Sequence, residues 1–317
     1  MKLGGIRIDN PFVQAPMAGV TDAPFRTLAR RFHKGLLFTE MVSAEALCRN
    51  NQRTLNYCKI LDEHHPVALQ LVGHDADRVA EAAKKAEAFG PDIIDINAGC
   101  PDNDIVRQGA GGALLKDPRK LVAIVEKVVK AVKVPVSVKL RLGYDTDISQ
   151  ELGRLLDDAG AAFLTFNGYL VTQKFSGKSD WPALKDLVDV LSIPVIANGG
   201  VKNEEDAVEL LTRSGAEGVM IGRASRGRPD IPGTSHALYS DGKYQRMSSE
   251  KLRETILDHA RMECELLDED RGMRRMRKHL HWYFKAAGLK YDASSVDGLS
   301  ALHALKKMLD AALSSHY

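Results

Sequence analysis

The 317-residue sequence contains no apolar run that approaches the roughly 20 residues needed to span a bilayer. Residues 1–7 lack the apolar stretch of a secretory signal peptide. The four cysteines, Cys48, Cys58, Cys100 and Cys264, form no Cys-x-x-Cys pair and show no metal-site spacing. We therefore expect a cytoplasmic protein in a reducing environment, with no membrane segment.

Acidic residues are absent from 271–290, directly after an acid-rich stretch at 263–270. The overall net charge of +2 therefore hides a polarised tail. On a helix, one face of this stretch would carry the basic residues Arg271, Arg274, Lys278, His281 and Lys285. Such a face is compatible with a merely solvated surface, but the missing acids favour phosphate binding.

A Gly-x-Gly-x-x-Gly motif after a strand is also missing, so no Rossmann dinucleotide site is indicated. What the chain does contain is a series of short runs rich in Val, Ile and Leu. Continuous runs of this kind are typical of parallel strands that are covered on both faces. They are Pro11–Met17, Leu36–Glu40, Val67–Val72, Ile93–Asn97, Val136–Leu140, Phe163–Asn167, Val195–Asn198 and Gly218–Ile221.

Helix-like stretches alternate with these runs. They are Ala76–Phe89, Pro118–Val132, Ser149–Ala159, Pro182–Leu191 and Glu204–Ser214. Asp117 and Pro118 form a cap followed by a first-turn proline, and Gly90, Gly160 and Gly215 stand where helices should end. Repeated strand–helix alternation predicts an α/β protein with a (β/α)8 TIM barrel.

The pattern changes after Arg223, where Gly227, Pro229, Pro232 and Gly233 interrupt the chain. From Ser248 onward the sequence is helical in character and has no strand-like run. We expect a barrel domain over residues 1–233, a linker over 234–247 and a small all-helical domain over 248–317.

Cys100 is the most informative residue, because it follows the run Ile93–Asn97 within Asn97-Ala98-Gly99-Cys100-Pro101. Active sites of TIM barrels lie at the carboxyl ends of the strands. A thiol with the ordinary pKa of about 8.5 is mostly protonated at pH 7, so it can donate a proton as well as attack. A lone cysteine is often a buried structural residue. Polar residues at nearly every strand end favour a functional one here.

A phosphate site is predicted after the seventh and eighth strands. Loops at this place recurrently bind phosphate in TIM barrels through backbone amides. The candidate residues are Asn198, Gly199, Gly200, Gly222 and Arg223. The glycines would let amides approach the phosphate, and Arg223 would add a forked cation.

Three further polar residues stand at strand ends. Lys139 alternates with apolar residues on the fifth strand and could face an anionic or electron-rich ligand, with Arg141 at the mouth. A lysine that merely reaches solvent is the alternative. Gln70, on the third strand, offers a donor and an acceptor that suit the edge of a heterocycle.

Taken together, these motifs resemble the dihydrouridine synthase family, flavin enzymes that reduce uridine in transfer RNA. The resemblance covers most of the chain, and its specificity lies in the order and spacing of the motifs. They begin at Ala15, Gln70, Asp95, Gly109, Val138, Asn198 and Met276, the last reading Met-Arg-Lys-His-Leu-His-Trp-Tyr.

The resemblance implies a TIM barrel that holds FMN, followed by a helical RNA-binding domain. It implies that Cys100 is the proton donor, that Asn97 helps to seat the uracil, and that Arg141 lies on the substrate side. The implied FMN contacts are Pro16, Met17, Ala18, Gln70, Lys139, Asn198, Gly199, Gly200, Gly222 and Arg223. Arg274 and Lys278 would grip RNA.

One position departs from the family. Its members usually carry His-Gly-Arg or His-Ala-Arg at the end of the sixth strand, where this chain has Asn167-Gly168-Tyr169. Asn167 can replace a neutral imidazole as a hydrogen-bond partner but does not titrate near pH 7. Tyr169 removes a cation and offers a stacking face. We expect FMN binding to survive and the substrate to be the property most affected.

The resemblance implies that reduced flavin passes a hydride to C6 of uracil while Cys100 protonates C5, with NADPH as the reductant that recharges the flavin. Three alternatives remain open at this point. The same chemistry could act on ribosomal or another RNA. The chain could reduce a free pyrimidine or enone, although this leaves the basic tail without a use. It could also bind flavin and RNA with little catalysis, which gives Cys100 no role.

Overall fold

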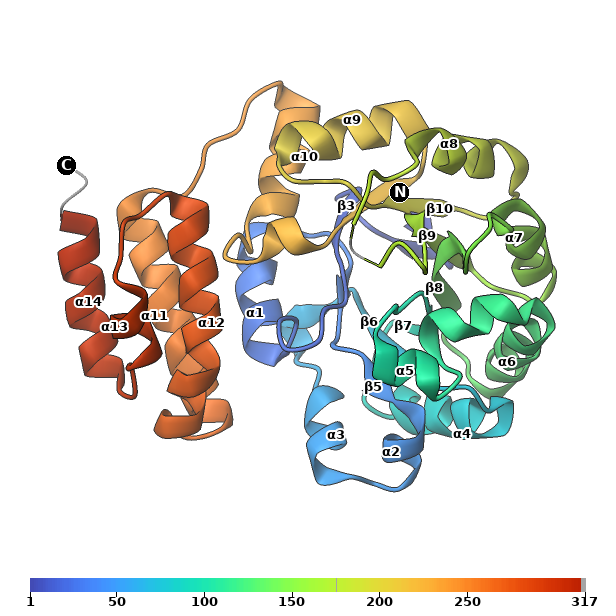
Figure 1. The fold of residues 1–317 in the computed structure, drawn as a ribbon, viewed down its shortest axis with the longest axis horizontal. Coiled ribbons are helices and arrows are strands. Elements are labelled where there is room, and N and C mark those ends of the chain that lie inside the picture. Colours follow the sequence, from blue (N-terminus) through green and yellow to red (C-terminus); the bar gives the residue numbers. More distant parts are fainter. Residues whose placement is uncertain (175, 315–317) are drawn as a thin grey trace.

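Parallel strands form a nearly closed barrel in the computed structural model, which describes residues 1–174 and 176–314 (Figure 1). The strands follow one another around the barrel in the order β3, β11, β10, β9, β8, β7, β6, β4. Their bounds are β3 Phe12–Gln14, β4 Leu37–Phe38, β6 Val67–Val72, β7 Ile93–Ala98, β8 Val136–Gly143, β9 Phe163–Leu170, β10 Val195–Asn198 and β11 Gly218–Ile221. The Gln14 amide donates to the Leu36 carbonyl at 3.2 Å and thereby links the first strand to β4. A short strand, β5 Val42–Ser43, also pairs with β6.

The helices between the strands surround the barrel, as predicted (Figure 1). Their bounds are α1 Ala23–Phe32, α2 Ala44–Cys48, α3 Gln52–Tyr57, α4 Ala76–Glu87, α5 Asn103–Arg107, α6 Pro118–Ala131, α7 Ser149–Asp158, α8 Trp181–Val190, α9 Glu204–Ser214 and α10 Ile231–Asp241. The predicted N-cap Asp117 accepts a hydrogen bond from the Lys120 amide, and Gly215 ends α9 in the left-handed conformation. The predicted TIM barrel is therefore confirmed, and β6, β10, β11 and α9 match their predicted bounds residue for residue.

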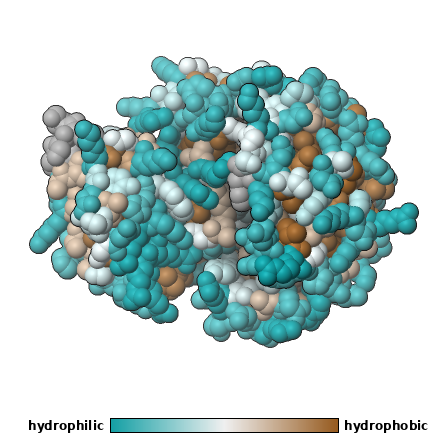
Figure 2. All heavy atoms as spheres, in the orientation of Figure 1, coloured by the Kyte–Doolittle hydropathy of each residue, from teal (hydrophilic) through white to brown (hydrophobic). Residues whose placement is uncertain are grey.

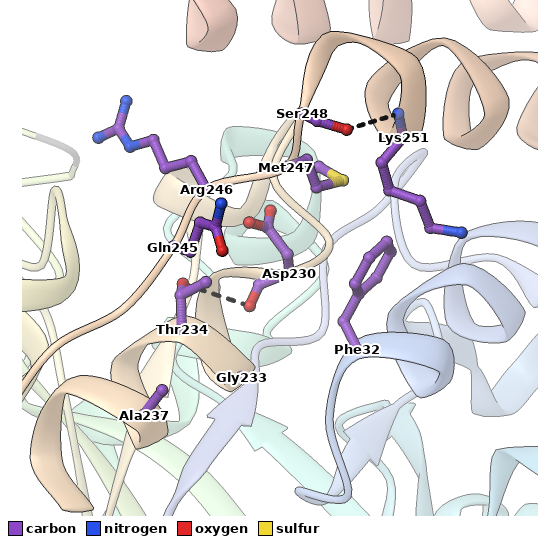
Figure 3. A pocket seen from close by; sticks show the side chains of 10 residues that line it. All are labelled: Phe32, Asp230, Gly233, Thr234, Ala237, Gln245, Arg246, Met247, Ser248 and Lys251. Carbon is purple, nitrogen blue, oxygen red and sulfur yellow. Dashed lines mark hydrogen bonds between the residues drawn. The ribbon is translucent and has the colours of Figure 1, made fainter. Parts of the chain in front are cut away.

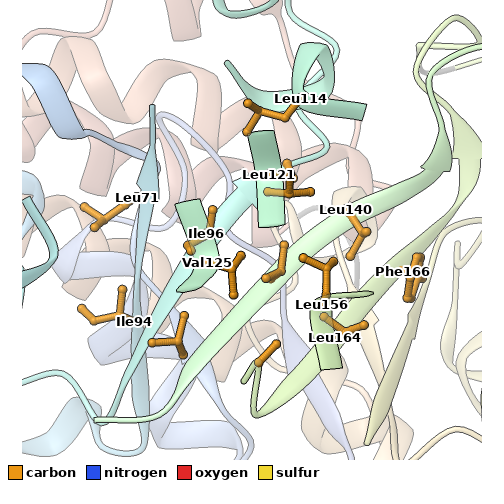
Figure 4. Packing of buried hydrophobic residues seen from close by; sticks show 14 of the residues in the cluster. Leu71, Ile94, Ile96, Leu114, Leu121, Val125, Leu140, Leu156, Leu164 and Phe166 are labelled. Carbon is orange, nitrogen blue, oxygen red and sulfur yellow. The ribbon is translucent and has the colours of Figure 1, made fainter. Parts of the chain in front are cut away.

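Two apolar layers stabilise the barrel. An inner cluster includes Val13, Phe38 and Phe163, and it is closed at the amino end by Leu3 and Ile8 of the hairpin formed by β1 Lys2–Leu3 and β2 Ile6–Arg7. An outer cluster packs the strands against the surrounding helices, as Figure 4 shows for Leu121, Val125 and Leu156 beside Ile96, Leu140 and Leu164. Because the hairpin fills the amino end, only the carboxyl end of the barrel is left for a site.

β8 and β9 extend beyond their predicted ends at Leu140 and Asn167. The two strands stay paired past a register shift between Arg141 and Gly143. Arg141 and Tyr169 are therefore buried strand residues rather than loop residues.

The predicted linker over 234–247 is wrong in its first half, because residues up to Asp241 form helix α10. Pro232 lies in the first turn of α10, where a proline starts a helix instead of interrupting it. Gly233 is needed because an added Cβ would come within 2.3 Å of the Phe32 carbonyl oxygen. α10 packs on β3 and α9 and completes the barrel, so the connection without helix is 242–248.

The remainder of the described chain is helical, as expected: α11 Ser249–Leu266, α12 Glu269–Ala287, α13 Ala293–Asp297 and α14 Leu302–Ser314. These helices share a second apolar cluster that includes Ile256, Met276 and Leu280. They stand beside the barrel against α1 (Figure 1). Among the described residues, no helix combines the length and apolar character of a bilayer span.

Candidate active site

Cys100 lies at the carboxyl end of β7 in a loop that backbone contacts hold in place. The Asn97 side-chain oxygen accepts hydrogen bonds from the Gly99 amide at 3.1 Å and the Cys100 amide at 2.9 Å. The Gly112 amide donates to the Cys100 carbonyl at 2.9 Å. Gly99 fits closely here, because an added Cβ would come within 3.2 Å of the Leu140 backbone. The thiol is half-buried, and burial raises its pKa, so it is protonated at neutral pH.

A chain of polar side chains runs through the barrel interior below Cys100. Asn97 donates its amide hydrogen to the Gln70 side-chain oxygen at 2.9 Å, and Gln70 donates to Asp95 at 2.7 Å. The Ser137 hydroxyl donates to the other Asp95 oxygen at 2.6 Å. Burial raises the pKa of Asp95 to about 6, against the two donors that favour the carboxylate. The side chains of Gln70 and Asn97 therefore have internal partners and chiefly orient the Cys100 loop.

Lys139 extends from β8 into the same end of the barrel. It donates to the Asn198 side-chain oxygen at 3.2 Å, and Asn198 donates to the Met220 carbonyl at 2.7 Å. Burial, together with the nearby Arg141, lowers the pKa of Lys139 to about 8. The Cys100 sulfur lies close enough to Lys139 to interact with it electrostatically. The structure thus brings the predicted acid and the predicted cation together.

Gly199 and Gly200 form a tight turn after β10, with φ of 112° and 82°. Ser179 and Trp181 pack directly against the turn, and the Trp181 indole donates to the Gly199 carbonyl at 3.1 Å. An added Cβ on Gly199 would lie 2.7 Å from the Ser179 hydroxyl and 2.8 Å from the Asn167 side-chain oxygen. Both the backbone conformation and the space therefore require glycine.

The exceptional residues Asn167 and Tyr169 lie beside this turn. The buried side-chain oxygen of Asn167 has no hydrogen-bond partner among the described residues. The neighbouring Ser179 hydroxyl also has none among them. Tyr169 is almost fully buried, and the Arg141 guanidinium lies 6.0 Å from its ring centre. Arg141 itself donates to the Gly99 carbonyl at 2.9 Å and the Leu170 carbonyl at 2.8 Å. Arg141 therefore braces the Cys100 loop against β9.

Arg223 follows Gly222 at the end of β11 and is exposed. It lies near Arg141 and Arg226, since it lowers the pKa of both groups electrostatically. Arg226 in turn stacks on the Trp282 ring at 4.9 Å. An added Cβ on Gly222 would meet only Ala15 at 3.8 Å, so the surface there is open. The predicted phosphate region is therefore cationic.

The loop that contains Pro16, Met17 and Ala18 connects β3 to α1 at the barrel mouth. The Gly19 amide donates to Glu40 at 2.5 Å. The Lys278 ammonium approaches the same loop and lies 2.8 Å from the position that a Cβ on Gly19 would take. Lys278 of α12 therefore faces the barrel mouth, not open solvent.

Arg274 lies one turn earlier on α12 and is exposed. It pairs with Asp270, and Arg271 pairs with Asp268 at 2.6 Å. The prediction that the basic face has no acidic partners is therefore wrong for Arg271 and Arg274. Asp268 and Asp270, which lie three and four positions before them, pair with them. His281 is also engaged, with Tyr291 at 2.9 Å and Asp297 at 3.0 Å.

Cavities occur in more than one part of the described structure. One, lined by α10, the 245–248 segment and Phe32, contains none of the predicted site residues (Figure 3). Another of about 490 Å³ lies beside the Cys100 loop, between Val72, His74, Ile105 and Ala110. The space-filling view shows a hollow between the helical domain and the barrel in a mostly hydrophilic surface (Figure 2).

Sequence reasoning missed several residues that support the site. Asp95 and Ser137 were overlooked, although an acid inside the apolar run Ile93–Asn97 signals a buried hydrogen-bond partner. Ser179 and Trp181, which shape the Gly199 turn, gave no such signal because their role depends on a distant strand end. Glu40 ends the predicted strand Leu36–Glu40, but its role as acceptor of the Gly19 amide was not predicted.

The donors at the barrel mouth fit a flavin phosphate and ring. Lys139 is a half-buried cation with a single hydrogen-bond partner in the described chain, the Asn198 side chain. The left-handed glycines Gly199 and Gly200 allow amides to approach an anion, and Arg223 adds charge nearby. The unpartnered oxygen of Asn167 is a further group that a heterocycle could satisfy.

Comparison with known proteins agrees with this geometry. The family model described as "Dihydrouridine synthase (Dus)" matches residues 13–313. A probable tRNA-dihydrouridine synthase from Rhizobium leguminosarum bv. phaseoli is 40% identical over 284 residues, which is 88% of this chain and 86% of the relative. The tRNA-dihydrouridine synthase B of Xanthomonas axonopodis pv. citri is 35% identical over 288 residues, or 90% and 87% of the two chains.

Solved structures show a likeness of fold. Morphinone reductase in complex with tetrahydroNAD superposes with a TM-score of 0.56 at 15% identity, over 80% of this chain and 92% of that one. An old yellow enzyme homologue from Zymomonas mobilis gives a TM-score of 0.53 at 16% identity, over 80% and 94%. With the family model matching nearly the whole sequence, the chain belongs to the dihydrouridine synthase family.

Proposed function

We propose that this chain reduces the C5=C6 bond of a uridine in tRNA, with Cys100 as the donor of the proton that C5 receives. The family reaction is the reduction of uridine to dihydrouridine with a flavin cofactor. The observation that carries the assignment is a half-buried thiol at the carboxyl end of β7, in the same barrel end as Lys139 and the Gly199 turn.

FMN, when bound, supplies the hydride for C6 of the uracil. The residues that would hold it are Lys139, Asn198, the Gly199–Gly200 turn and Arg223, with the loop Pro16–Ala18 along the ring. Gln70 supports the proposed FMN site indirectly, since its side chain is hydrogen-bonded to Asn97 and Asp95. NADPH is the proposed source of electrons, using the same cleft.

Cys100 supplies the proton. Its S–H bond breaks as the C5–H bond forms, and the resulting thiolate regains a proton from water. Burial keeps the thiol protonated in the resting chain, while the nearby cations Lys139 and Arg141 stabilise the thiolate once it forms. Asn97 and Arg141 hold the loop, so that the thiol does not drift when the proton leaves.

The RNA is proposed to lie across the hollow between barrel and helical domain. Lys278 borders this space, and Arg274 lies one turn away on α12. A uridine must leave its stack to enter a barrel mouth, and contacts to neighbouring phosphates offset that cost. Tyr169 and Asn167 replace the usual histidine and arginine, so we propose them as determinants of which uridine is accepted.

RNA from cells with and without this gene tests the proposal. Transfer RNA and ribosomal RNA are digested separately, and dihydrouridine is quantified by mass spectrometry. A tRNA site that loses dihydrouridine in the deletion strain, and regains it with the wild-type gene but not with Cys100→Ala, is the expected result. A loss confined to ribosomal RNA would mean that the substrate is ribosomal RNA instead of tRNA. No loss in either pool would refute the proposed reaction.

A further inference from the structure

A second group of chemically capable side chains lies away from the barrel mouth, between α11 and α12. His259 and Glu263 stand four residues apart on α11, so both point from the same face of the helix. His279 faces them from α12, and the two imidazole rings are 4.5 Å apart between centres. All three side chains are fully buried. Their potential ligand atoms lie within 4.8 Å of one another.

These side chains are poorly satisfied within the protein. His259 Nε2, both Glu263 oxygens and both ring nitrogens of His279 have no hydrogen-bond partner among the described residues. Glu263 lies beside the Asp22 carboxyl and forms ion-pair contacts with His259 Nε2 at 3.7 Å and Arg275 Nε at 3.6 Å. Buried polar atoms are rarely left in this state, because each costs about 1–3 kcal/mol.

The surroundings hold the rings in a ligating orientation. The Tyr283 hydroxyl lies 3.2 Å from His259 Nδ1, which leaves Nε2 directed toward Glu263. His279 lies close to the Gly19 backbone, and both of its ring nitrogens are without a hydrogen-bond partner among the described residues. Metal-binding histidines ordinarily have one nitrogen held by such an outer partner and the other on the ion.

Charged side chains also surround the cluster. Arg275 contacts three buried carboxylates: Asp22 at 2.7 Å, Glu40 at 3.2 Å and Glu263 at 3.6 Å. The half-buried Lys278 interacts electrostatically with all three, and the buried Arg26 interacts with Asp22 and Glu40. Charge alone therefore does not require an added ion, but the unpartnered ligand atoms of His259, Glu263 and His279 remain unsatisfied.

We propose that His259, Glu263 and His279 bind a divalent first-row transition ion, with Zn²⁺ as the ion to test. Two imidazoles and one carboxylate are a donor set that such ions accept. Tetrahedral Zn²⁺ with bonds of about 2.0–2.1 Å holds its ligands about 3.3 Å apart, so small side-chain rotations must close the site. Bound metal would fasten α11 to α12 and, through Asp22 and Arg275, to the barrel.

The experiment uses the full chain, produced without a histidine tag and loaded with zinc, followed by elemental analysis and thermal unfolding. About one zinc ion per chain and a higher unfolding temperature than in chelator-treated protein are expected. His259→Gln and Glu263→Gln should bind zinc at least ten-fold more weakly, since loss of even a supporting partner has that effect. Circular dichroism and flavin content establish that each variant is folded.

Matched controls lie on exposed positions of the same helical domain. Glu265→Gln on α11 and His303→Gln on α14 should bind zinc like the wild type. Cys264→Ser tests adventitious thiol binding next to the cluster. Absence of zinc from the wild type, equal zinc in Glu263→Gln, or loss of zinc in Cys264→Ser alone would each overturn the proposal. Because no RNA or flavin turnover is measured, failure here leaves the proposed uridine reduction untouched.

Discussion

Replacement of Cys100 by alanine is the sharpest test of the chemistry. A thiol with the ordinary pKa of about 8.5 is about 97% protonated at pH 7, and burial raises the pKa of Cys100 further. The proton to be donated is therefore present in nearly every molecule. Positioned general-acid catalysis contributes about 10²–10⁴-fold, equivalent to about 3–5 kcal/mol of activation free energy. We expect Cys100→Ala to lose product formation by that factor.

The loop around Cys100 should survive this substitution. Its three principal hydrogen bonds use the backbone amides of Gly99, Cys100 and Gly112, none of which the change removes. Alanine deletes a single sulfur from a half-buried position, so the unfolding free energy should fall by about 1 kcal/mol or less. Flavin content and the rate of flavin reduction by NADPH should consequently match the wild type.

The assay is a single turnover with pre-reduced enzyme and an unmodified tRNA transcript, with dihydrouridine counted by mass spectrometry. Cys100→Ser keeps the size of the side chain but replaces the thiol by a much weaker acid, so it should fall close to the alanine variant. Product formation by Cys100→Ala within about threefold of the wild type would refute proton donation by this residue. A parallel loss of bound flavin would instead assign Cys100 a structural role.

Other consequences are equally open to measurement. Arg274→Gln and Lys278→Gln should each weaken tRNA binding and lower the slope of log affinity against log salt, and an unchanged slope would remove these residues from the RNA surface. Lys139 has its pKa lowered to about 8, so it loses its charge above that pH. The affinity of the flavin-free chain for FMN should then fall by up to about tenfold per pH unit above pH 8, and Lys139→Met should abolish this dependence. Burial lowers the pKa of both His33 and His64 from 6.5 to about 3, so their neutral forms stabilise the fold above pH 6.5 and this contribution is lost as pH falls toward 3. Urea unfolding should show a loss of about 1.4 kcal/mol per histidine per pH unit in that window, and a flat profile would contradict it.

The barrel was predictable because its signals are local. The apolar runs of β6, β10 and β11, and the capped helix α9, carry their own boundaries in composition and in residues such as Asn203 and Gly215. The linker was misplaced because Pro and Gly occur both in chain breaks and within folded elements, as Pro232 and Gly233 do here. One starts a helix and the other permits a close approach to Phe32, and only the packed structure distinguishes these from a chain break.

The site was predictable at the level of strand ends, but not of partners. The positions of Cys100, Lys139 and Gly199 follow from the rule that strands present their carboxyl ends together. Whether Arg141 faces substrate or braces a loop depends on the Leu170 carbonyl across the sheet, and no sequence pattern reports that. The availability of the basic residues of α12 was misjudged for a similar reason, because Asp270 pairs with Arg274.

The contacts between barrel and helices give the arrangement a mechanical consequence. Arg275 of α12 holds Glu40, and Glu40 accepts the Gly19 amide at 2.5 Å. The Lys278 ammonium reaches the same glycine from the next turn of α12. The loop proposed to line the flavin is thus fixed by the helix proposed to touch RNA. Any shift of α12 on binding RNA must therefore also displace this loop, because packed, hydrogen-bonded elements move together rather than independently.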